Sequence, residues 1–319
     1  MTMSNWRQKL AKAVEDGKVL EDSEKNIELL LAGISDERAE EAIGELVNDE
    51  QWEELNDRFY KTMAFGTGGM RGRTVGKVVT GPERGQSERG ECPEVPCYGT
   101  ASMNFYNLNR AMRGFISHVG KHLIASGEDR KPVFVIAHDT RHFSADFARY
   151  CGKVCTDLGC DVHLFDGPRA TPELSFALRV LKADAGVVLT ASHNPSHDNG
   201  FKAYFSDGGQ IVEPHAGGII AEVNALATDS YDPLPEHEQG KARFLGREMD
   251  ERYMRKLRTI LLRPELLEGR PAKVVYTNLH GTGGWIVVPM LRALGFEVLT
   301  VEEQDTQDGG FPTVDSPNP

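Results

Sequence analysis

The stretch AGVVLTASHNP, residues 185–195, decides how the rest of the sequence is interpreted. Its first half, 185–189, is short, apolar and uncharged, which is typical of a strand buried on both faces of a parallel sheet. A hydroxyl, an imidazole and an amide then follow in quick succession, and Pro195 prevents the strand from continuing. Ligands of open α/β sheets bind just beyond the carboxyl ends of strands. Ser192 is therefore the leading candidate for the reactive residue.

Alternating strands and helices extend from this stretch in both directions. Apolar runs predict strands over 133–136 and 161–165, each followed by a helical segment. Downstream, Asn199-Gly200 predicts a tight turn, and 201–205 is predicted as an edge strand. This alternation predicts an α/β fold in which helices cover both faces of a sheet.

Three regions of different character divide the chain. Residues 1–58 predict an amphipathic, helical N-terminal extension, and residues 59–228 hold the strands and the serine stretch of a first α/β domain. The acidic, proline-containing segment 228–246 predicts a linker. Residues 229–319 contain one further βα unit. A single parallel βαβ unit cannot bury both faces of its strands, so this second domain is predicted to be incomplete.

A glycine-rich stretch, FGTGGMRGR, occupies residues 65–73. Its glycines allow the backbone to approach a ligand closely and to direct N–H groups at an anion. Arg71 and Arg73 add guanidinium groups suited to phosphate. The spacing fits neither the P-loop nor the dinucleotide-binding motif, so a nucleotide-dependent oxidoreductase is the weakest of the functional alternatives.

Composition narrows the classes of partner. The sequence has 36 Lys and Arg against 48 Asp and Glu, a net charge of −12, which argues against a nucleic-acid partner but allows an anionic substrate in a local basic pocket. No apolar run approaches the ~18 residues of a membrane span, so no membrane partner is expected. Five cysteines and the absence of a signal peptide favour a cytoplasmic setting. Cys151 and Cys155 are interpreted as small apolar helix residues rather than zinc ligands.

The residues alone leave several reactions possible for Ser192. Successive side chains of an extended chain point apart, so His193 is a poor base for its neighbour. A serine hydrolase would also need a G-x-S-x-G elbow, which the sequence lacks. The turn at Asn199-Gly200 would return Lys202 toward Ser192, and cationic and amide donors around a serine suit phosphoryl transfer better than acyl transfer. Each residue also has a non-functional interpretation. Ser192 would then only cap a turn, Lys202 would be a solvated surface amine, and His280 would be a loop imidazole bonded to the backbone.

The serine stretch, with Asn199-Gly200-x-Lys202 after it, resembles the phosphoserine loop of the α-D-phosphohexomutases, the phosphoglucomutase and phosphomannomutase family. FGTGGMRG at 65–72 resembles that family's N-terminal phosphate-contacting signature. Asp139-Thr140-Arg141 and Gly208-Gly209-Gln210-Ile211 match in order. The helical lead-in and Leu279-His280-Gly281-Thr282-Gly283 are most similar to the phosphoglucomutase-2 and phosphopentomutase-like branch.

The resemblance implies both a fold and a reaction. The fold is α/β, with a mixed, mostly parallel sheet sandwiched by helices, an incomplete second α/β domain and the helical extension. The reaction is that of an isomerase, an intramolecular phosphotransferase that interconverts sugar 1-phosphate and sugar 6-phosphate, or pentose 1- and 5-phosphates. A phosphoserine gives its phosphoryl group to the sugar phosphate substrate, and the other phosphate of the resulting bisphosphate returns to the serine. A sugar 1,6-bisphosphate is the expected activator.

The resemblance also assigns roles to residues. Ser192 would carry the phosphoryl group and, through its phosphate, contact Mg²⁺. Arg71 and Lys202 would be the acid/base and electrostatic pair, and His193 would contact the phosphate. The residues expected to bind substrate or phosphate are Thr67, Gly68, Gly69, Arg71, Asn194 and His280.

The sequence departs from the family pattern in one large respect. It contains no D-x-D-x-D-R metal loop, and the family's sugar loop and C-terminal phosphate loop are also not found. We therefore expect an N-terminal portion of a mutase with little or no activity alone, the remaining Mg²⁺ ligands lying in the missing part. A non-catalytic module that binds sugar phosphates is the alternative. The preferred sugar and the oligomeric state are open at this stage.

Overall fold

The apolar run at 185–189 forms a fully buried strand at the centre of the molecule. The computed structural model describes residues 4–66, 68–267, 272–314 and 317. Within them, six strands form one sheet: β1 (Gly69–Arg73), β2 (Val133–His138), β3 (Asp161–Phe165), β4 (Ala185–Leu189), β5 (Asp198–Phe205) and β6 (Ala242–Leu245). All five residues of β4 are buried, as its sequence predicts.

The sheet has the strand order β1-β5-β4-β2-β3-β6. Strands β4, β2, β3 and β6 run parallel to one another, whereas β5 is antiparallel to both β4 and β1. The predicted α/β class, with a mixed and mostly parallel sheet, is confirmed. The carboxyl ends of β4 and β2 therefore meet at one edge of the sheet.

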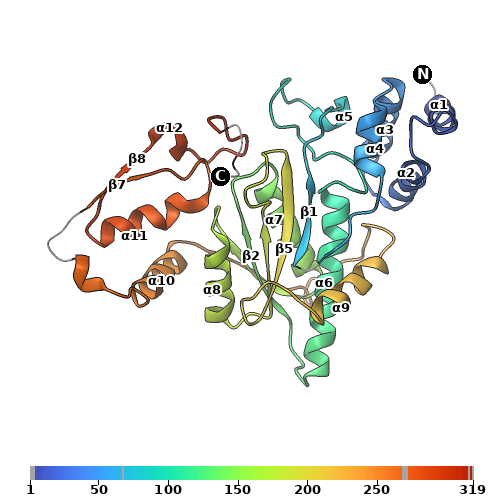
Figure 1. Cartoon of the computed structure of the whole chain (residues 1–319). Coiled ribbons are helices and arrows are strands. Elements are labelled where there is room, and N and C mark those ends of the chain that lie inside the picture. The colour runs from blue at the N-terminus through green and yellow to red at the C-terminus, as the bar shows by residue number, and fades with distance from the viewer. Residues whose placement is uncertain (1–3, 67, 268–271, 315–316, 318–319) are drawn as a thin grey trace.

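Helices cover both faces of this sheet (Figure 1). One face packs against α6 (Phe105–Ala125) and α7 (Ser144–Asp157), and α9 (His215–Asn224) lies along α6. The other face packs against α8 (Thr171–Leu181), with α10 (Arg247–Arg258) beside it. Because helices cover the two faces of the sheet, the side chains that a ligand can reach lie at the strand ends.

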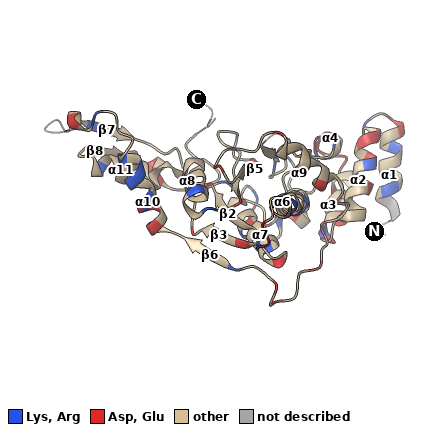
Figure 2. Ribbon diagram, turned by 90° about the horizontal axis from the view of Figure 1, so that it is seen from below, with Lys and Arg blue, Asp and Glu red and all other residues tan. Residues whose placement is uncertain are grey.

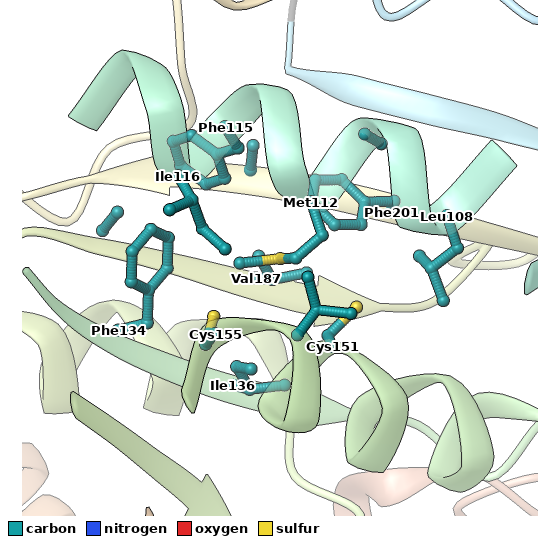
Figure 3. Close-up of a cluster of buried hydrophobic side chains, with 14 of the residues drawn as sticks. Leu108, Met112, Phe115, Ile116, Phe134, Ile136, Cys151, Cys155, Val187 and Phe201 are labelled. Carbon is teal, nitrogen blue, oxygen red and sulfur yellow. The ribbon is translucent and has the colours of Figure 1, made fainter. Parts of the chain in front are cut away.

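The larger core lies between α6, α7 and the sheet (Figure 3). Phe115 packs edge-on against Phe134 and Phe201, with ring centroids 5.4 and 6.4 Å apart. Cys151 and Cys155 of α7 are fully buried in this core as small apolar residues, in agreement with their interpretation from the sequence.

Two expectations about β5 are wrong. Asn199 and Gly200 lie within the strand rather than in a turn, since the chain reverses earlier, through the backbone hydrogen bonds Asn194 N–H to Ala191 O and Asp198 N–H to Pro195 O. Strand β5 is also not an edge strand, because the glycine-rich stretch supplies β1 on its outer side. A Cβ at Gly200 would lie 2.6 Å from the Thr190 carbonyl oxygen, so glycine serves close strand packing here.

The segment 228–246 is also more than a linker. Its last part forms β6, which pairs in parallel with β3 at the edge of the sheet. The predicted domain boundary at 228/229 therefore falls before a strand that belongs to the first sheet. The chain then forms α10 and a small parallel sheet of β7 (Lys273–Tyr276) and β8 (Glu297–Thr300), with α11 (Val287–Ala293), α12 (Glu302–Asp305) and 3₁₀ turns at Pro264–Leu267 and Thr282–Trp285.

The N-terminal region is helical, as predicted, and has a core of its own. It consists of α1 (Ser4–Glu15), α2 (Glu21–Gly33), α3 (Arg38–Asn48) and α4 (Trp52–Phe59), followed after β1 by the short α5 (Gly81–Arg84). Tyr106 of α6 completes this core and so joins it to the sheet domain. Charged residues are frequent along α1 and α2, the first helices of this region (Figure 2). In the described part of the chain, no helix combines the length and apolarity needed to cross a membrane.

Candidate active site

Ser192 lies just past the end of β4, at the edge where β2 also ends. Its backbone has a φ of +59°, a left-handed conformation that non-glycine residues seldom adopt. The Ser192 N–H donates to Thr190 Oγ1 at 2.9 Å, which fixes the turn. The side chain is exposed. A strained serine held at the surface of a rigid sheet is typical of a functional position.

Arg141 holds the serine loop from beneath. Its side chain is 1% exposed, and its guanidinium donates to four backbone carbonyls. Nη1 donates to Pro195 O at 2.6 Å and Asp198 O at 3.1 Å, and Nη2 donates to Ser192 O at 2.9 Å and Asn194 O at 2.5 Å. One side chain thus fixes the whole reversal between β4 and β5. Burial lowers the pKa of Arg141, and Asp139 opposes that shift.

Asp139 joins the loop to the end of β2. Its Oδ2 accepts from Thr190 Oγ1 at 2.5 Å and stands 3.2 Å from Arg141 Nε. Its Oδ1 accepts from Ser144 Oγ at 2.7 Å and from the Arg141 backbone N–H at 3.0 Å. Asn199 Nδ2 donates to Ser144 Oγ at 2.9 Å and closes the network.

The sequence pattern assigns no role to these supporting residues. Asp139 and Arg141 enter it only as part of a matching motif. The sequence does contain a signal for the placement of Asp139. Polar residues begin shortly after the predicted strand 133–136, and parallel strands end at the same edge of a sheet. The burial of Arg141 under the loop does not follow from that pattern.

A cleft of about 380 Å³ opens in front of Ser192. Ser192, His193 and Lys202 all line it, so the structure brings these three predicted residues together. The opposite wall comes from the second unit, through Asn278 to Thr282. The cleft therefore lies between the serine loop and the turn after β7.

Lys202 reaches the cleft from β5. Its backbone pairs with Gly69 of β1 and Val188 of β4, so its position is fixed by the sheet. The side chain is half-buried. Burial, and secondarily the Arg71 guanidinium, lower the pKa of Lys202. An amine that gives up its proton more readily suits proton transfer.

Arg71 contacts the serine loop from the neighbouring strand. Its Nη1 donates to Asn194 Oδ1 at 3.1 Å, and Asn194 Nδ2 donates to Asp198 Oδ2 at 2.8 Å. The Arg71 side chain is otherwise exposed. Arg71 and Asn194 are therefore brought together, although neither lines the cleft in front of Ser192.

The glycines of the 65–73 stretch are required by the packing of β1. A Cβ at Gly69, where φ is +131°, would lie 1.8 Å from Phe201 O, and one at Gly68 would lie 2.3 Å from Gln210 Nε2. Gly68 O accepts from the Ala203 N–H at 3.0 Å. Thr67, the third predicted phosphate contact here, lies outside the described residues.

His280 lies inside the second unit, fully buried and away from the cleft lining. Its Nδ1 is 3.0 Å from Thr306 O, and its Nε2 is 2.8 Å from Thr313 Oγ1. These contacts orient the turn whose residues Leu279, Gly281 and Thr282 do face the cleft. A direct phosphate contact by His280 stays a prediction.

The described residues do not form a metal site on their own. Nowhere in them do three His, Cys, Asp or Glu side chains gather in a group able to hold a metal ion. Asp139, the carboxylate beneath the serine loop, is already engaged by Ser144, Thr190 and Arg141. Enzymes related to this chain use Mg²⁺, and a contact to it through the Ser192 phosphate stays a prediction.

The fold and the site define a class: an α/β protein whose exposed serine, at a parallel strand end, faces a cationic cleft. Comparison with known families agrees. Residues 96–230 match phosphoglucomutase/phosphomannomutase, alpha/beta/alpha domain I, and residues 251–319 match alpha/beta/alpha domain II. The chain belongs to the phosphoglucomutase/phosphomannomutase family, with domains I and II matched.

Individual relatives show the extent of the likeness. A phosphoglucomutase of Staphylococcus epidermidis is 30% identical over 284 residues, 88% of this chain and 46% of the relative. The phosphoribomutase of Saccharomyces cerevisiae is 30% identical over 302 residues, 88% of this chain and 43% of the relative. A candidate phosphomannomutase structure from Thermus thermophilus superposes with a TM-score of 0.58 at 26% identity, covering 80% of this chain and 48% of that one. The chain thus spans less than half the length of these relatives.

Proposed function

We propose that Ser192 carries a phosphoryl group in a phosphosugar mutase reaction, the interconversion of sugar 1-phosphate and sugar 6-phosphate or of pentose 1- and 5-phosphates. The observation that supports this most is that the exposed Ser192 hydroxyl lines the same cleft as Lys202. The Ser192 backbone has a φ of +59°, and the hydrogen bonds from Arg141 to the loop carbonyls hold it there. Relatives named phosphoglucomutase and phosphoribomutase favour a hexose or pentose phosphate as the substrate.

The proposed step exchanges one phosphorus–oxygen bond for another. The sugar hydroxyl oxygen bonds to phosphorus, the bond from phosphorus to Ser192 Oγ breaks, and the hydroxyl proton passes to a base. Lys202, with its lowered pKa, is the candidate base, and the proton that it accepts then passes to Ser192 Oγ, which becomes the new alcohol. The second phosphate of the bisphosphate then returns to Ser192 by the same exchange. Loosely bonded phosphoryl transition states depend mostly on positioning and on nearby positive charge.

The other residues of the site would bind and orient. Arg71 and His193 supply donors to the phosphoserine, with Asn194 held between Arg71 and Asp198. The backbone of Thr67, Gly68 and Gly69 and the turn at His280 stay proposed phosphate contacts. Through its phosphate, Ser192 would be this chain's contribution to the Mg²⁺ site, and a sugar 1,6-bisphosphate would load the serine.

Intact-mass spectrometry tests the proposal directly. We expect the protein, as purified or after incubation with glucose 1,6-bisphosphate or ribose 1,5-bisphosphate, to carry one phosphoryl group. Ser192→Ala should lose it, whereas Ser196→Ala, a serine of the same loop, should keep it. A phosphoryl group that persists in Ser192→Ala would refute the assignment. Sugar phosphate binding without phosphorylation would favour the non-catalytic binding module.

A further inference from the structure

A second groove is lined by residues of β1 and residues at and just after the end of α4. Its volume is about 350 Å³, close to that of the cleft in front of Ser192. We call it the outer groove. Its polar and charged lining residues include Asp57, Tyr60, Lys61, Arg71, Arg73 and Ser102. Of its lining residues, the proposed mutase reaction uses only Arg71.

Three cations in the outer groove have no carboxylate partner. Within the part of the chain that the structure describes, Lys61, Arg71 and Arg73 form no ion pair. Like charges gathered in one groove repel one another, and an anion between them would relieve that repulsion.

The acidic groups near the outer groove are already engaged. Asp57 pairs with Lys77. Asp198 stands opposite Arg73 in the strand register, but its Oδ2 accepts from Asn194 and its Oδ1 lies 3.6 Å from His197 Nε2. Arg58 also lines the groove, yet its buried guanidinium is taken up by Glu54 and Glu83. The charge that remains available to a ligand is therefore positive.

Within the described residues, the side chains of Lys61, Arg71 and Arg73 keep hydrogen-bond donors that a ligand could use. Arg73 makes one hydrogen bond, from Nη1 to Val75 O at 3.3 Å, and Arg71 makes one, from Nη1 to Asn194 Oδ1 at 3.1 Å. The Lys61 ammonium lies 4.9 Å from the Tyr60 ring centroid. Two guanidinium forks and an ammonium can bind a phosphorylated ligand through several oxygens at once.

We propose that the outer groove is a binding site for a small molecule carrying two phosphate groups, separate from the cleft at Ser192. The ligand's phosphates lie between Lys61, Arg73 and Arg71. Because Arg71 also holds Asn194 of the serine loop, occupancy of the groove competes for this arginine and so communicates with the candidate active site.

Isothermal titration of the full chain with inorganic pyrophosphate tests this site. We expect binding to persist in Ser192→Ala and Lys202→Met, since neither residue lines the outer groove. Lys61→Glu and Arg73→Gln should each weaken it by about tenfold or more. The matched control is Lys12→Glu, which makes the same charge change as Lys61→Glu at an exposed position of α1. Thermal unfolding of each variant checks its fold.

The results separate the two sites. No measurable binding of pyrophosphate to the wild-type chain would overturn the proposal. So would a loss of affinity in Lys202→Met together with unchanged affinity in Lys61→Glu and Arg73→Gln, because the anion would then occupy the cleft. Ser192 phosphorylation should be normal in Lys61→Glu, so failure of the outer groove and failure of the proposed mutase chemistry give different results.

Discussion

The conformation of the serine loop in the candidate site depends on Arg141, a residue whose side chain is buried. Its four carbonyl contacts add to the two backbone hydrogen bonds that turn the chain between β4 and β5. A planar guanidinium can satisfy four acceptors in one plane, which an ammonium cannot. The φ of +59° at Ser192 persists because this clamp over-determines the loop.

We expect Arg141→Lys to destabilise the protein by about 3 kcal/mol, since a lysine leaves buried carbonyls without donors. Phosphorylation of Ser192 should fall with it. Urea unfolding and intact-mass spectrometry measure the two effects. Arg149→Lys, at an exposed position of α7 where the arginine pairs only with Asp146, serves as the control and should change neither. Equal unfolding free energies for Arg141→Lys and the wild type would show that the clamp is dispensable.

Strand β1 is the element on which the cationic side of the site depends. It places Arg71 opposite Gly200, and its pairing with β5 gives Lys202 a neighbour on both sides. That pairing requires Gly69, because a Cβ there would lie 1.8 Å from the Phe201 carbonyl oxygen and the backbone cannot yield as a flexible side chain would.

Gly69→Ala should therefore separate β1 from β5 and cost more than about 3 kcal/mol of unfolding free energy. Gly90→Ala is the matched control, because Gly90 also has a positive φ, +99°, but no atom within 4 Å of the new methyl group. It should cost only the ~1 kcal/mol of backbone strain. Chemical denaturation of both variants gives the comparison, and similar losses would mean that strain, not the clash, dominates at Gly69.

The elements differ in how well the sequence predicts them. The uncharged run 185–189 predicts a buried strand, which the structure confirms, because that signal is local. The hydroxyl after it indicates the candidate site through an equally local signal. The sequence does not predict β1 because its glycines are typical of a loop, and what makes them a strand is the close approach of β5. The sequence does not predict strand β6 either, because only four residues of the segment 228–246 pair with β3 and three of these four are exposed. Asn199-Gly200 resembles a turn because the Arg141 clamp that turns the chain earlier is a tertiary contact.

At the scale of the whole molecule, the two α/β units meet beside the cleft through Arg169. This buried arginine follows β3, and its Nε and Nη2 donate to Asp250 of α10 at 2.7 and 2.9 Å. The Trp285 ring of the second unit lies 4.4 Å from its Cζ. Glu173 of α8 is fully buried next to this pair. Burial, and then the Asp250 carboxylate, raise the pKa of Glu173 from 4.5 to about 8.

The sign of this shift predicts how the contact depends on pH. A carboxyl group whose pKa is higher in the folded chain binds its proton more tightly there. Its stabilising effect is full below the unfolded value near 4.5 and is lost as the pH rises through about 8. Glutamine mimics the protonated group and cannot ionise. We therefore expect Glu173→Gln to unfold less readily than the wild type at high pH, with an advantage of about 2 kcal/mol near pH 9.

The advantage of Glu173→Gln should shrink steadily toward about pH 5, where the wild-type carboxyl is largely protonated in the folded chain and close to its ordinary titration in the unfolded one. Urea unfolding across that range measures the gap. Glu248→Gln, an exposed carboxylate on α10, controls for the loss of one negative charge and should give a small difference that does not grow with pH. A Glu173→Gln curve parallel to that of the wild type would mean that Glu173 is already ionised at the junction. Arg169 would then face a third charged carboxylate besides those of Asp250 and Asp166.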